Sequence, residues 1–403
     1  MTIEMTPVGA TARWIAAARA LETEHEKPLF TDPYARALAG DDGFALLTEM
    51  RLAAGPTAGS TGPDLYLSLR TRFLDDGLLS AVRDRGITQV VLLAAGMDTR
   101  AFRLPWPRDV VVYELDRDDV FDAKEPVLAE LGANAACDRR VVRVDLALEW
   151  IPQLLATGFD RSRPAAFLTE GLLMYLEPSA AEKVVGGISS IAADDSWIGL
   201  DAVNKEMLDS PFTAAYMKKL ADVGAPWHFA IPNPDIFFAH HGWQAKVSMP
   251  GEPDANFGRW PYPAMPRSMP GIPRSYFVTA IKGATALQLP APVSIASAEH
   301  YAWGQGCDGW HLVRQEGISV IQERMPAGTT EERHRHPRAR QFFYVLTGTL
   351  TLEMEGVTHT LAPGAGIEVP PGAAHTAANQ GPSEAEFLLV SQPPAQGDRE
   401  PAS

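Results

Sequence analysis

The stretch that decides the fold of this chain is QVVLLAAGMDTR, residues 89–100, in which an apolar run ends on a glycine. A short β-branched run that leads into a glycine is typical of a buried strand followed by a ligand-binding loop. Similar apolar runs follow at Asp109–Asp116, Arg140–Leu146, Pro164–Glu170, Ser196–Val203 and Ser275–Lys282. Helix-like segments such as Arg117–Leu131 and Ser179–Ala192 lie between them. This alternation predicts βαβ units and an α/β domain with a mainly parallel sheet.

Composition narrows the class of protein. The 403 residues are 46% hydrophobic and 21% charged, which is enough for two or three domains with real cores. The net charge is 35 − 50 = −15, so nucleic acids and anionic membranes are disfavoured as partners. Two cysteines, Cys137 and Cys307, cannot form a disulfide framework, and they favour a reducing compartment. The N-terminus has no basic segment before an apolar run, and no stretch reaches the ~18 apolar residues of a membrane span. We therefore expect a soluble cytoplasmic protein.

The pattern along the chain predicts two domains. Residues 1–283 form the first, in which about residues 1–85 make a helical cap with breaks near 27–33 and 55–63. The proline-rich residues 250–273 are expected to cross its surface as an ordered loop. Residues 284–297 are small and almost uncharged, which predicts a linker between the two domains. Short alternating strands at 298–392, such as Gln341–Glu355, predict a small antiparallel barrel. Residues 393–403 are expected to form a disordered tail.

The loop after the first strand indicates which ligand the parallel sheet binds. Glu114 and Asp116 end the second strand, 18 and 20 residues after Gly96, where an acidic side chain accepts ribose hydroxyls. NAD and S-adenosylmethionine both contain such a ribose. A dinucleotide loop needs G-x-G-x-x-G, whereas residues 94–99 lack two of the three glycines and place Asp98 where a pyrophosphate would lie. A sulfonium cofactor without phosphate suits that carboxylate better. The alternative is that the glycine only follows the first strand, as in any parallel sheet.

Six separated motifs occur in order along the first domain. They are KPLFTDPYA (27–35), LSLRTRFLDD (67–76), VVLLAAGMDTRAFRLPWP (90–107), VYELD (112–116), VVRVDL (141–146) and TEGLLMYL (169–176). Together they resemble the leucine carboxyl methyltransferase family, whose members are Rossmann-like, S-adenosylmethionine-dependent O-methyltransferases. The resemblance runs from about residue 8 to residue 283.

The resemblance implies a set of cofactor-binding residues, which are Arg70, Gly96, Glu114, Asp145, Leu146, Glu170 and, in the lid, Lys27. Arg70 would pair with the methionyl carboxylate, with Arg72 as a second candidate, and Glu170 would receive the methionyl ammonium. Glu114 would take the ribose hydroxyls. An arginine and a carboxylate that pair with the two opposite charges of a zwitterion orient the ligand as well as increase its binding affinity.

The remaining implied contacts lie along the cofactor. Gly96 would underlie the methionine, and Asp145 with Leu146 would flank the adenine. Ala94 departs from the family pattern, which usually has glycine there, and an alanine would crowd the loop. Each residue also has an alternative role: Glu114 would cap the following helix, and Arg70 would make a surface ion pair of little energetic worth.

Methyl transfer requires the nucleophile, the methyl carbon and the sulfur to be held in line. A carboxylate acceptor needs no general base, whereas a phenol, enol or alcohol needs one within hydrogen-bond reach. The candidates after the fourth and fifth strands are Tyr175, Asp201, Asn204, His240 and His241. Ordinary packing or surface exposure is the alternative for each of them.

A second constellation lies in the predicted barrel. Residues two apart on a strand share a face, so His334 and His336 can both point inward, and His375 follows a PPG turn. Both halves, G(x5)HxH(x4)Q(x6)G and G(x5)PPG(x2)H(x3)N, resemble the cupin motif, with Gln341 in place of the usual glutamate. The resemblance implies one divalent transition metal on His334, His336, Gln341 and His375. Such a site accommodates Fe, Ni, Zn, Mn or Cu, and a metal-free barrel is the alternative.

Three functional hypotheses remain open. The first is an O-methyltransferase of a small metabolite with a carboxylate, enol or phenol acceptor, in bacterial specialised metabolism, whose metallocupin performs a coupled step. In the second, the cupin is a noncatalytic dimerisation or substrate-binding module, which gives a homodimer through the cupin. The third is a binding protein with a decayed cofactor site.

Overall fold

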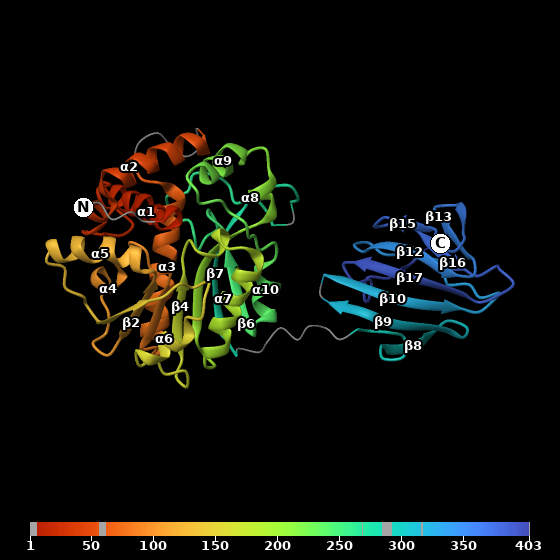
Figure 1. Ribbon diagram of the computed structural model, residues 1–403. Coiled ribbons are helices and arrows are strands. Elements are labelled where there is room, and N and C mark those ends of the chain that lie inside the picture. Colours follow the sequence, from red (N-terminus) through yellow and green to blue (C-terminus); the bar gives the residue numbers. More distant parts are fainter. Residues whose placement is uncertain (1–5, 56–61, 268, 284–291, 316, 403) are drawn as a thin grey trace. The chain divides into compact units, whose positions relative to one another are not determined.

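The chain divides into two compact units, Met1–Gln288 and Leu289–Ser403, whose elements are labelled in Figure 1. The computed structural model describes residues 6–55, 62–267, 269–283, 292–315 and 317–402. The division falls inside residues 284–297, the segment that the sequence predicts as a linker. The first unit is α/β and the second is all β, as expected.

The first unit is built on one seven-stranded sheet. Its strands, in spatial order, are β3 (Asp138–Arg143), β2 (Val111–Asp116), β1 (Gln89–Leu93), β4 (Ala165–Thr169), β5 (Trp197–Val203), β7 (Ser275–Lys282) and β6 (Trp243–Ser248). Strands β3 to β5 pair in parallel, and β7 is antiparallel to both β5 and β6. The chain order reverses between β1 and β4, and in open α/β sheets ligands bind at the carboxyl ends of the strands at such a point.

All six strands predicted in this domain are confirmed, and β6 is an addition to them. The WQAKVS sequence of β6 is partly exposed at the sheet edge, so it lacks the continuous apolar run that marks β1 and β4. The described part of residues 250–273 contains no helix or strand, as predicted from its prolines.

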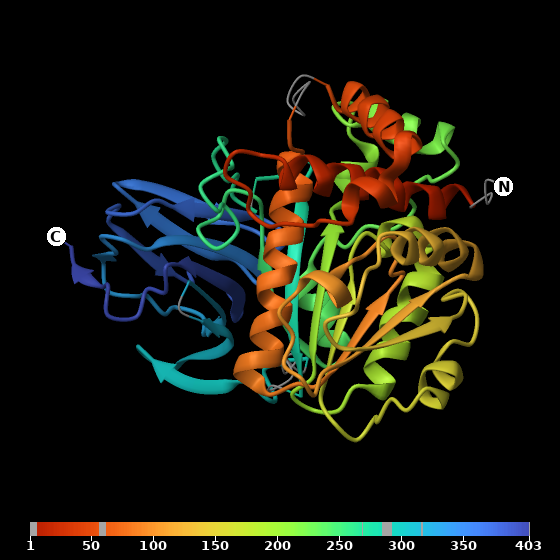
Figure 2. The same cartoon turned by 90° about the vertical axis from the view of Figure 1, so that its left-hand side faces the viewer.

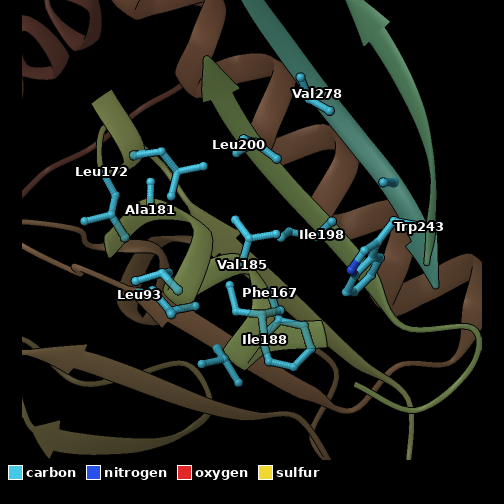
Figure 3. Close-up of a cluster of buried hydrophobic side chains, with 14 of the residues drawn as sticks. Leu93, Phe167, Leu172, Ala181, Val185, Ile188, Ile198, Leu200, Trp243 and Val278 are labelled. Carbon is cyan, nitrogen blue, oxygen red and sulfur yellow. The ribbon is translucent and has the colours of Figure 1, made fainter. Parts of the chain in front are cut away.

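Helices cover the two faces of the sheet. They are α3 (Leu65–Arg85), α4 (Arg100–Arg103), α5 (Asp118–Glu130), α6 (Ile151–Ala156), α7 (Pro178–Ile191) and α10 (Pro234–His240), with a 3₁₀ turn at Leu173–Tyr175. Two further helices, α8 (Lys205–Asp209) and α9 (Ala214–Asp222), pack with the helical cap. Helix α7 begins at Pro178 as expected, and its Ala181, Val185 and Ile188 pack against Phe167 and other strand residues (Figure 3). Among the described residues, no helix is long and apolar enough to cross a membrane.

The helical cap consists of α1 (Pro7–Thr23), α2 (Ala35–Ala54) and the start of α3. Trp14 of α1 packs against Leu47 and Met50 of α2 in a buried apolar cluster. The Thr6 hydroxyl caps α1 by accepting from the Gly9 N–H at 3.3 Å. The cap lies beyond the carboxyl ends of the parallel strands (Figure 2), so it closes the ligand side of the sheet.

The second unit is a barrel of two antiparallel sheets. One contains β15 (Gly366–Val369), β12 (Arg340–Thr347), β17 (Ala385–Gln392), β10 (Ile318–Met325), β9 (Cys307–Gln315) and β8 (Glu299–Trp303). The other contains β14 (Val357–Leu361), β13 (Leu350–Met354), β16 (His375–Ala378), β11 (His334–Arg335) and β18 (Glu400–Pro401). Phe343, Val345, Leu352 and Phe387 belong to the apolar core of this unit. The predicted cupin barrel is confirmed.

The prediction of a disordered tail over 393–403 is wrong for its described part. Strand β18 pairs with β11, where Pro401 lies opposite His334. The Asp398 carboxylate fixes the segment, since it accepts from the backbone N–H groups of Arg338 at 2.9 Å and Ala339 at 2.8 Å. Composition alone gave no sign of this long-range anchor, because a proline- and charge-rich segment is also typical of disorder.

Candidate functional sites

A cavity of about 820 Å³ opens at the carboxyl ends of β1, β2, β4 and β5, beneath the cap. Five residues predicted to bind the cofactor line it, namely Arg70, Gly96, Asp145, Leu146 and Glu170. Its volume lies in the upper part of the ~300–1,000 Å³ range of small-molecule sites, so it has room for a cofactor and an acceptor together.

Gly96 must be a glycine for two reasons. Its φ is +48°, and a Cβ built on it would lie 2.9 Å from the Cβ of Ala12 in α1. Ala94, where the family pattern has glycine, also has a positive φ of 52° and lines the cavity. An alanine in this left-handed region costs roughly 1–2 kcal/mol, so the departure noted in the sequence is a strained one.

Asp116, and not Glu114, lies where the sequence predicts the carboxylate that contacts the ribose. The Asp116 carboxylate lines the cavity and accepts from the N–H of Gly96 at 2.7 Å and of Arg117 at 2.8 Å. Burial raises the pKa of Asp116, and these two N–H groups act against that rise. A carboxylate fixed at the end of the second strand suits a pair of ribose hydroxyls.

Glu114 is buried within the domain and does not line the cavity. Its carboxylate makes ion pairs with Lys124 at 2.7 Å and Arg139 at 2.8 Å. The two acidic residues share a strand face, but Glu114 lies two residues deeper, under α5. The assignment of the ribose contact to Glu114 is therefore corrected in favour of Asp116.

A buried network of charges joins the cap helix α3 to the strand ends. The Arg70 guanidinium donates to Glu170 at 2.9 Å through Nε and to Asp201 at 2.9 Å through Nη1, which leaves Nη2 for a ligand. Arg100 holds the other oxygen of Glu170 at 2.7 Å. Although burial alone would raise the pKa of Glu170, the charges of Arg100 and Arg70 lower it. The network presents an ionised carboxylate beside a cation, which matches a methionyl zwitterion.

Asp98 keeps its negative charge inside this cavity. Burial alone would raise its pKa, but the Arg100 guanidinium that contacts it, together with Lys124 and further cations, lowers the pKa to about 2. Arg100 also pairs with Asp75 and Glu170, so it has little capacity for a phosphate. A fixed carboxylate at this point accepts a sulfonium cation and repels a pyrophosphate.

Two residues from the candidate lists lie outside the cavity for visible reasons. Lys27 is exposed, and its carbonyl accepts from Arg259 at 2.9 Å. Arg72, the second candidate for the carboxylate, pairs with Asp76 on the surface at 2.7 Å. The cap contributes Arg19 instead, which donates to Asp32 at 2.8 Å and to the carbonyl of Met97. No motif spacing pointed to Arg19, because its position depends on how α1 packs.

Of the five candidate catalytic residues, Tyr175 and Asp201 line the cavity. Asp201 is fully buried and accepts from Arg70, from the Gly171 N–H at 2.6 Å and from the Tyr66 hydroxyl at 3.3 Å. Burial raises the pKa of Tyr175.

The other three candidates have structural roles. Asn204 caps α8 by accepting from the Met207 N–H at 3.1 Å. His240 is exposed at the end of α10, and His241 lies 3.0 Å from Glu182. None of the three lines the cavity.

The second site lies inside the barrel. His334, His336 and His375 are buried, with ring nitrogens within 4.8 Å of one another. They are brought together because His334 and His375 are direct partners between β11 and β16, and His336 follows two residues after His334. The Nε2 atoms of His334 and His336 are 3.1 Å apart.

Backbone carbonyls fix the tautomer of each imidazole. The Nδ1 atoms of His334, His336 and His375 lie 2.9, 3.2 and 3.0 Å from the carbonyl oxygens of Glu332, Asp398 and Ala373. Each Nδ1 therefore carries the hydrogen, and each Nε2 presents a lone pair. Burial lowers the pKa of all three rings, that of His334 to about 3, so they remain neutral.

This donor set fits a transition metal. Lone pairs of neighbouring Nε2 atoms repel one another, and Nε2 of His375 is buried without a hydrogen-bond partner. Gln341 is buried beside Ser391, to which its Nε2 donates at 3.4 Å, and its Oε1 has no partner. Three imidazoles and one amide oxygen are suitable ligands for a divalent cation, which would relieve this repulsion.

Comparisons with known proteins agree with both halves of this description. The family model for leucine carboxyl methyltransferases matches residues 12–189, and that for the cupin domain matches residues 321–391. A protein of Mycobacterium ulcerans, named as an S-adenosyl-L-methionine-dependent methyltransferase, is 41% identical over 233 residues, covering 55% of this chain and 70% of its own. One of Mycobacteroides abscessus with the same name is 34% identical over 296 residues, covering 69% and 96%.

Among solved structures, an RmlC-like cupin from Shewanella frigidimarina is 21% identical, covers 27% of this chain and 95% of its own, and has a TM-score of 0.25. The fold, the cavity and the relatives define an S-adenosylmethionine-dependent methyltransferase joined to a cupin domain. The chain belongs to the leucine carboxyl methyltransferase family.

The two acidic residues of β2 give separable effects. We expect Asp116→Asn to weaken S-adenosylmethionine binding about tenfold or more, since it removes a charged acceptor. Glu114→Gln leaves the affinity near that of the wild type but lowers the unfolding free energy by ~3–5 kcal/mol, because Lys124 loses a buried partner. Calorimetric titration and urea unfolding measure the two quantities. Loss of binding in a folded Glu114→Gln protein, with Asp116→Asn unaffected, would contradict the assignment.

Metal content tests the barrel site. We expect purified protein to hold about one transition metal per chain and the His334→Ala/His375→Ala variant to lose it. His300→Ala is the matched control, since that exposed histidine of the same unit pairs with Asp308 at 2.7 Å. Elemental mass spectrometry gives the ratio. Equal metal content in both variants would place the metal elsewhere.

The backbone carbonyl oxygen of Asp398 holds the ring of His336, so the segment that the Asp398 carboxylate anchors supports this predicted metal ligand. Asp398→Ala frees that segment, and we expect it to weaken metal binding by about tenfold, as the loss of an outer partner of a ligand does. Glu400→Ala, which removes a half-exposed ion pair with Arg335, serves as the control. Competition with a metal-binding dye measures both affinities. An unchanged metal affinity in Asp398→Ala would show that the segment anchored by Asp398 does not orient His336.

Proposed function

We propose that this protein transfers a methyl group from S-adenosylmethionine to an oxygen of a small metabolite, and that the cupin performs a coupled step on the same pathway. The acceptor oxygen belongs to a carboxylate, an enol or a phenol. The observation that carries the methyl-transfer half is the cavity in which Asp116, Glu170 and Arg70 face one space with room for a second ligand.

The residues of the chain bind and orient both reactants. Arg70 and Glu170 hold the methionyl end, and Asp116 holds the ribose. Asp201 keeps Arg70 in place and accepts from Tyr66, so it is a positioning residue. Residues of α1 and α2 line the cavity, so the cap limits the access of water to it. When bound, the cofactor would supply an electrophilic methyl carbon, and its S–C bond would break as the new O–C bond forms.

The acceptor's proton has a route when the acceptor is a hydroxyl. The Tyr66 hydroxyl donates to Asp201 at 3.3 Å and lines the cavity. It can accept the acceptor's hydrogen while it passes its own to Asp201. A carboxylate acceptor is already deprotonated and does not need this route.

The cupin half of the proposal rests on the clustered ring nitrogens of His334, His336 and His375, and on the buried Gln341 amide oxygen, which has no hydrogen-bond partner among the described residues. A metal held by these residues would supply Lewis acidity. An isomerisation or a cyclisation, which needs no external oxidant, is the class of step that fits this role. The pairing of two activities in one chain is typical of bacterial specialised metabolism.

Mass spectrometry of extracts incubated with the protein and labelled S-adenosylmethionine tests the proposal. We expect a product that is heavier than its precursor by the 14 Da of one added CH₂ plus the extra mass of the isotopic label. The full chain carrying His334→Ala and His375→Ala should accumulate a different product from the wild type. If both proteins give the same final product, the cupin is a noncatalytic binding or dimerisation module. No labelled product and no cofactor binding would favour the decayed binding protein.

A further inference from the structure

The cavity has two parts that differ in chemistry. The charged residues described above gather where the strands end. The rest of the wall comes from α2, α8, α9 and residues 249–275, and it is formed mostly by apolar and aromatic side chains. Since the charged part matches the cofactor, the second part is left for the acceptor.

One wall of this second part is aromatic. Tyr175 and Tyr216 both pack edge-on against Trp227, with ring centroids 6.1 and 5.8 Å apart and interplanar angles of 90° and 74°. All three rings line the cavity, and Tyr66 continues the wall towards Asp201. Rings locked edge-to-face in this way give a rigid apolar surface at little cost in side-chain entropy.

A second group of aromatic rings comes from the proline-rich segment. Trp260 and Tyr262 pack edge-on with centroids 5.5 Å apart, and both line the cavity. At the rim, Phe212 is 90% exposed, Tyr262 44% and Met265 38%. Apolar side chains of this size that line a cavity and still face water indicate contact with an apolar ligand.

The cations that line the cavity make several hydrogen bonds within the protein, although the Nε atoms of Arg51 and Arg274 are buried without a partner in the described part of the chain. Arg274 donates to the carbonyl oxygens of Ile272, Pro266 and Met269 at 3.0, 2.7 and 2.6 Å. Arg51 donates to the Gly62 carbonyl at 2.6 Å, and Arg117 pairs with Asp119 at 3.3 Å. A peptide with its many polar groups would find few partners to offset its desolvation, whereas the two partnerless Nε donors suit a single oxygen group on an otherwise apolar acceptor.

We propose that the methyl acceptor is a flat, largely apolar ring system of at least two fused rings that packs against the aromatic rings around Trp227 and Trp260. This inference rests on the proposed methyl-transfer function and names the acceptor class of the same site. The oxygen to be methylated lies on the edge of the ring system that points towards Tyr66 and Asp201, and the opposite edge reaches the rim at Phe212.

Binding of matched probes to the full-length protein tests this acceptor class. The protein is first saturated with S-adenosylhomocysteine, whose own affinity is measured by calorimetry. The probes 2-naphthol and 2-naphthoate are then compared with 4-methylphenol and with a tetrapeptide ending in leucine. We expect one of the naphthalene probes to bind at least about tenfold more tightly than either comparison ligand.

Two variants locate the site. Trp260→Ala and Tyr216→Ala should each weaken naphthalene binding by about tenfold and leave S-adenosylhomocysteine affinity unchanged, which also shows that they are folded. Phe342→Ala removes a half-exposed aromatic ring in the second unit and serves as the control. Equal or tighter binding of the peptide, no binding of any probe, or no effect of either variant would overturn the proposal. Failure to bind S-adenosylhomocysteine would instead count against the methyltransferase function.

Discussion

The buried ion network around Arg70 is the interaction on which the rest of the first unit depends. Arg70 lies on α3, Glu170 follows β4, Asp201 lies on β5 and Arg100 begins α4, so four elements meet through charged contacts. Removing one partner from such a buried set leaves an uncompensated charge, which costs about 3–5 kcal/mol. The network therefore fixes the cap to the sheet, and it also sets the charge of the cavity. Structure and ligand preference follow from the same contacts.

Both units present electron-rich groups that suit a positively charged ligand. In the first, carboxylates that would repel one another are kept ionised by arginines, and this leaves a pocket that suits a cation. In the second, three neutral imidazoles with fixed tautomers direct lone pairs at one another inside an apolar barrel. Carboxylates with shifted pKa values and buried ring nitrogens without a hydrogen-bond partner are both typical of functional sites. Methyl transfer and metal chemistry are thus proposed from the same kind of observation.

The fold and the general place of both sites could be predicted because they depend on local patterns. The apolar runs of β1 and β4, the glycine after β1 and the paired histidines two residues apart each determine structure over a few residues. The sequence could not show that Asp116, and not Glu114, faces the cavity, since both residues lie on one strand face and differ only in how deeply they are buried. The anchor at Asp398 and the aromatic walls depend on contacts between distant segments, which no local pattern reveals.

The central claim is that the cavity over the parallel sheet accepts a positively charged sulfur compound and rejects a diphosphate. Calorimetric titration of the full-length protein with S-adenosylmethionine, and separately with NAD⁺, tests it most directly. The charges of Asp98 and Asp116 predict binding of the first, with NAD⁺ unable to displace it even in large excess. Saturable binding of NAD⁺ that excludes S-adenosylmethionine would contradict the account.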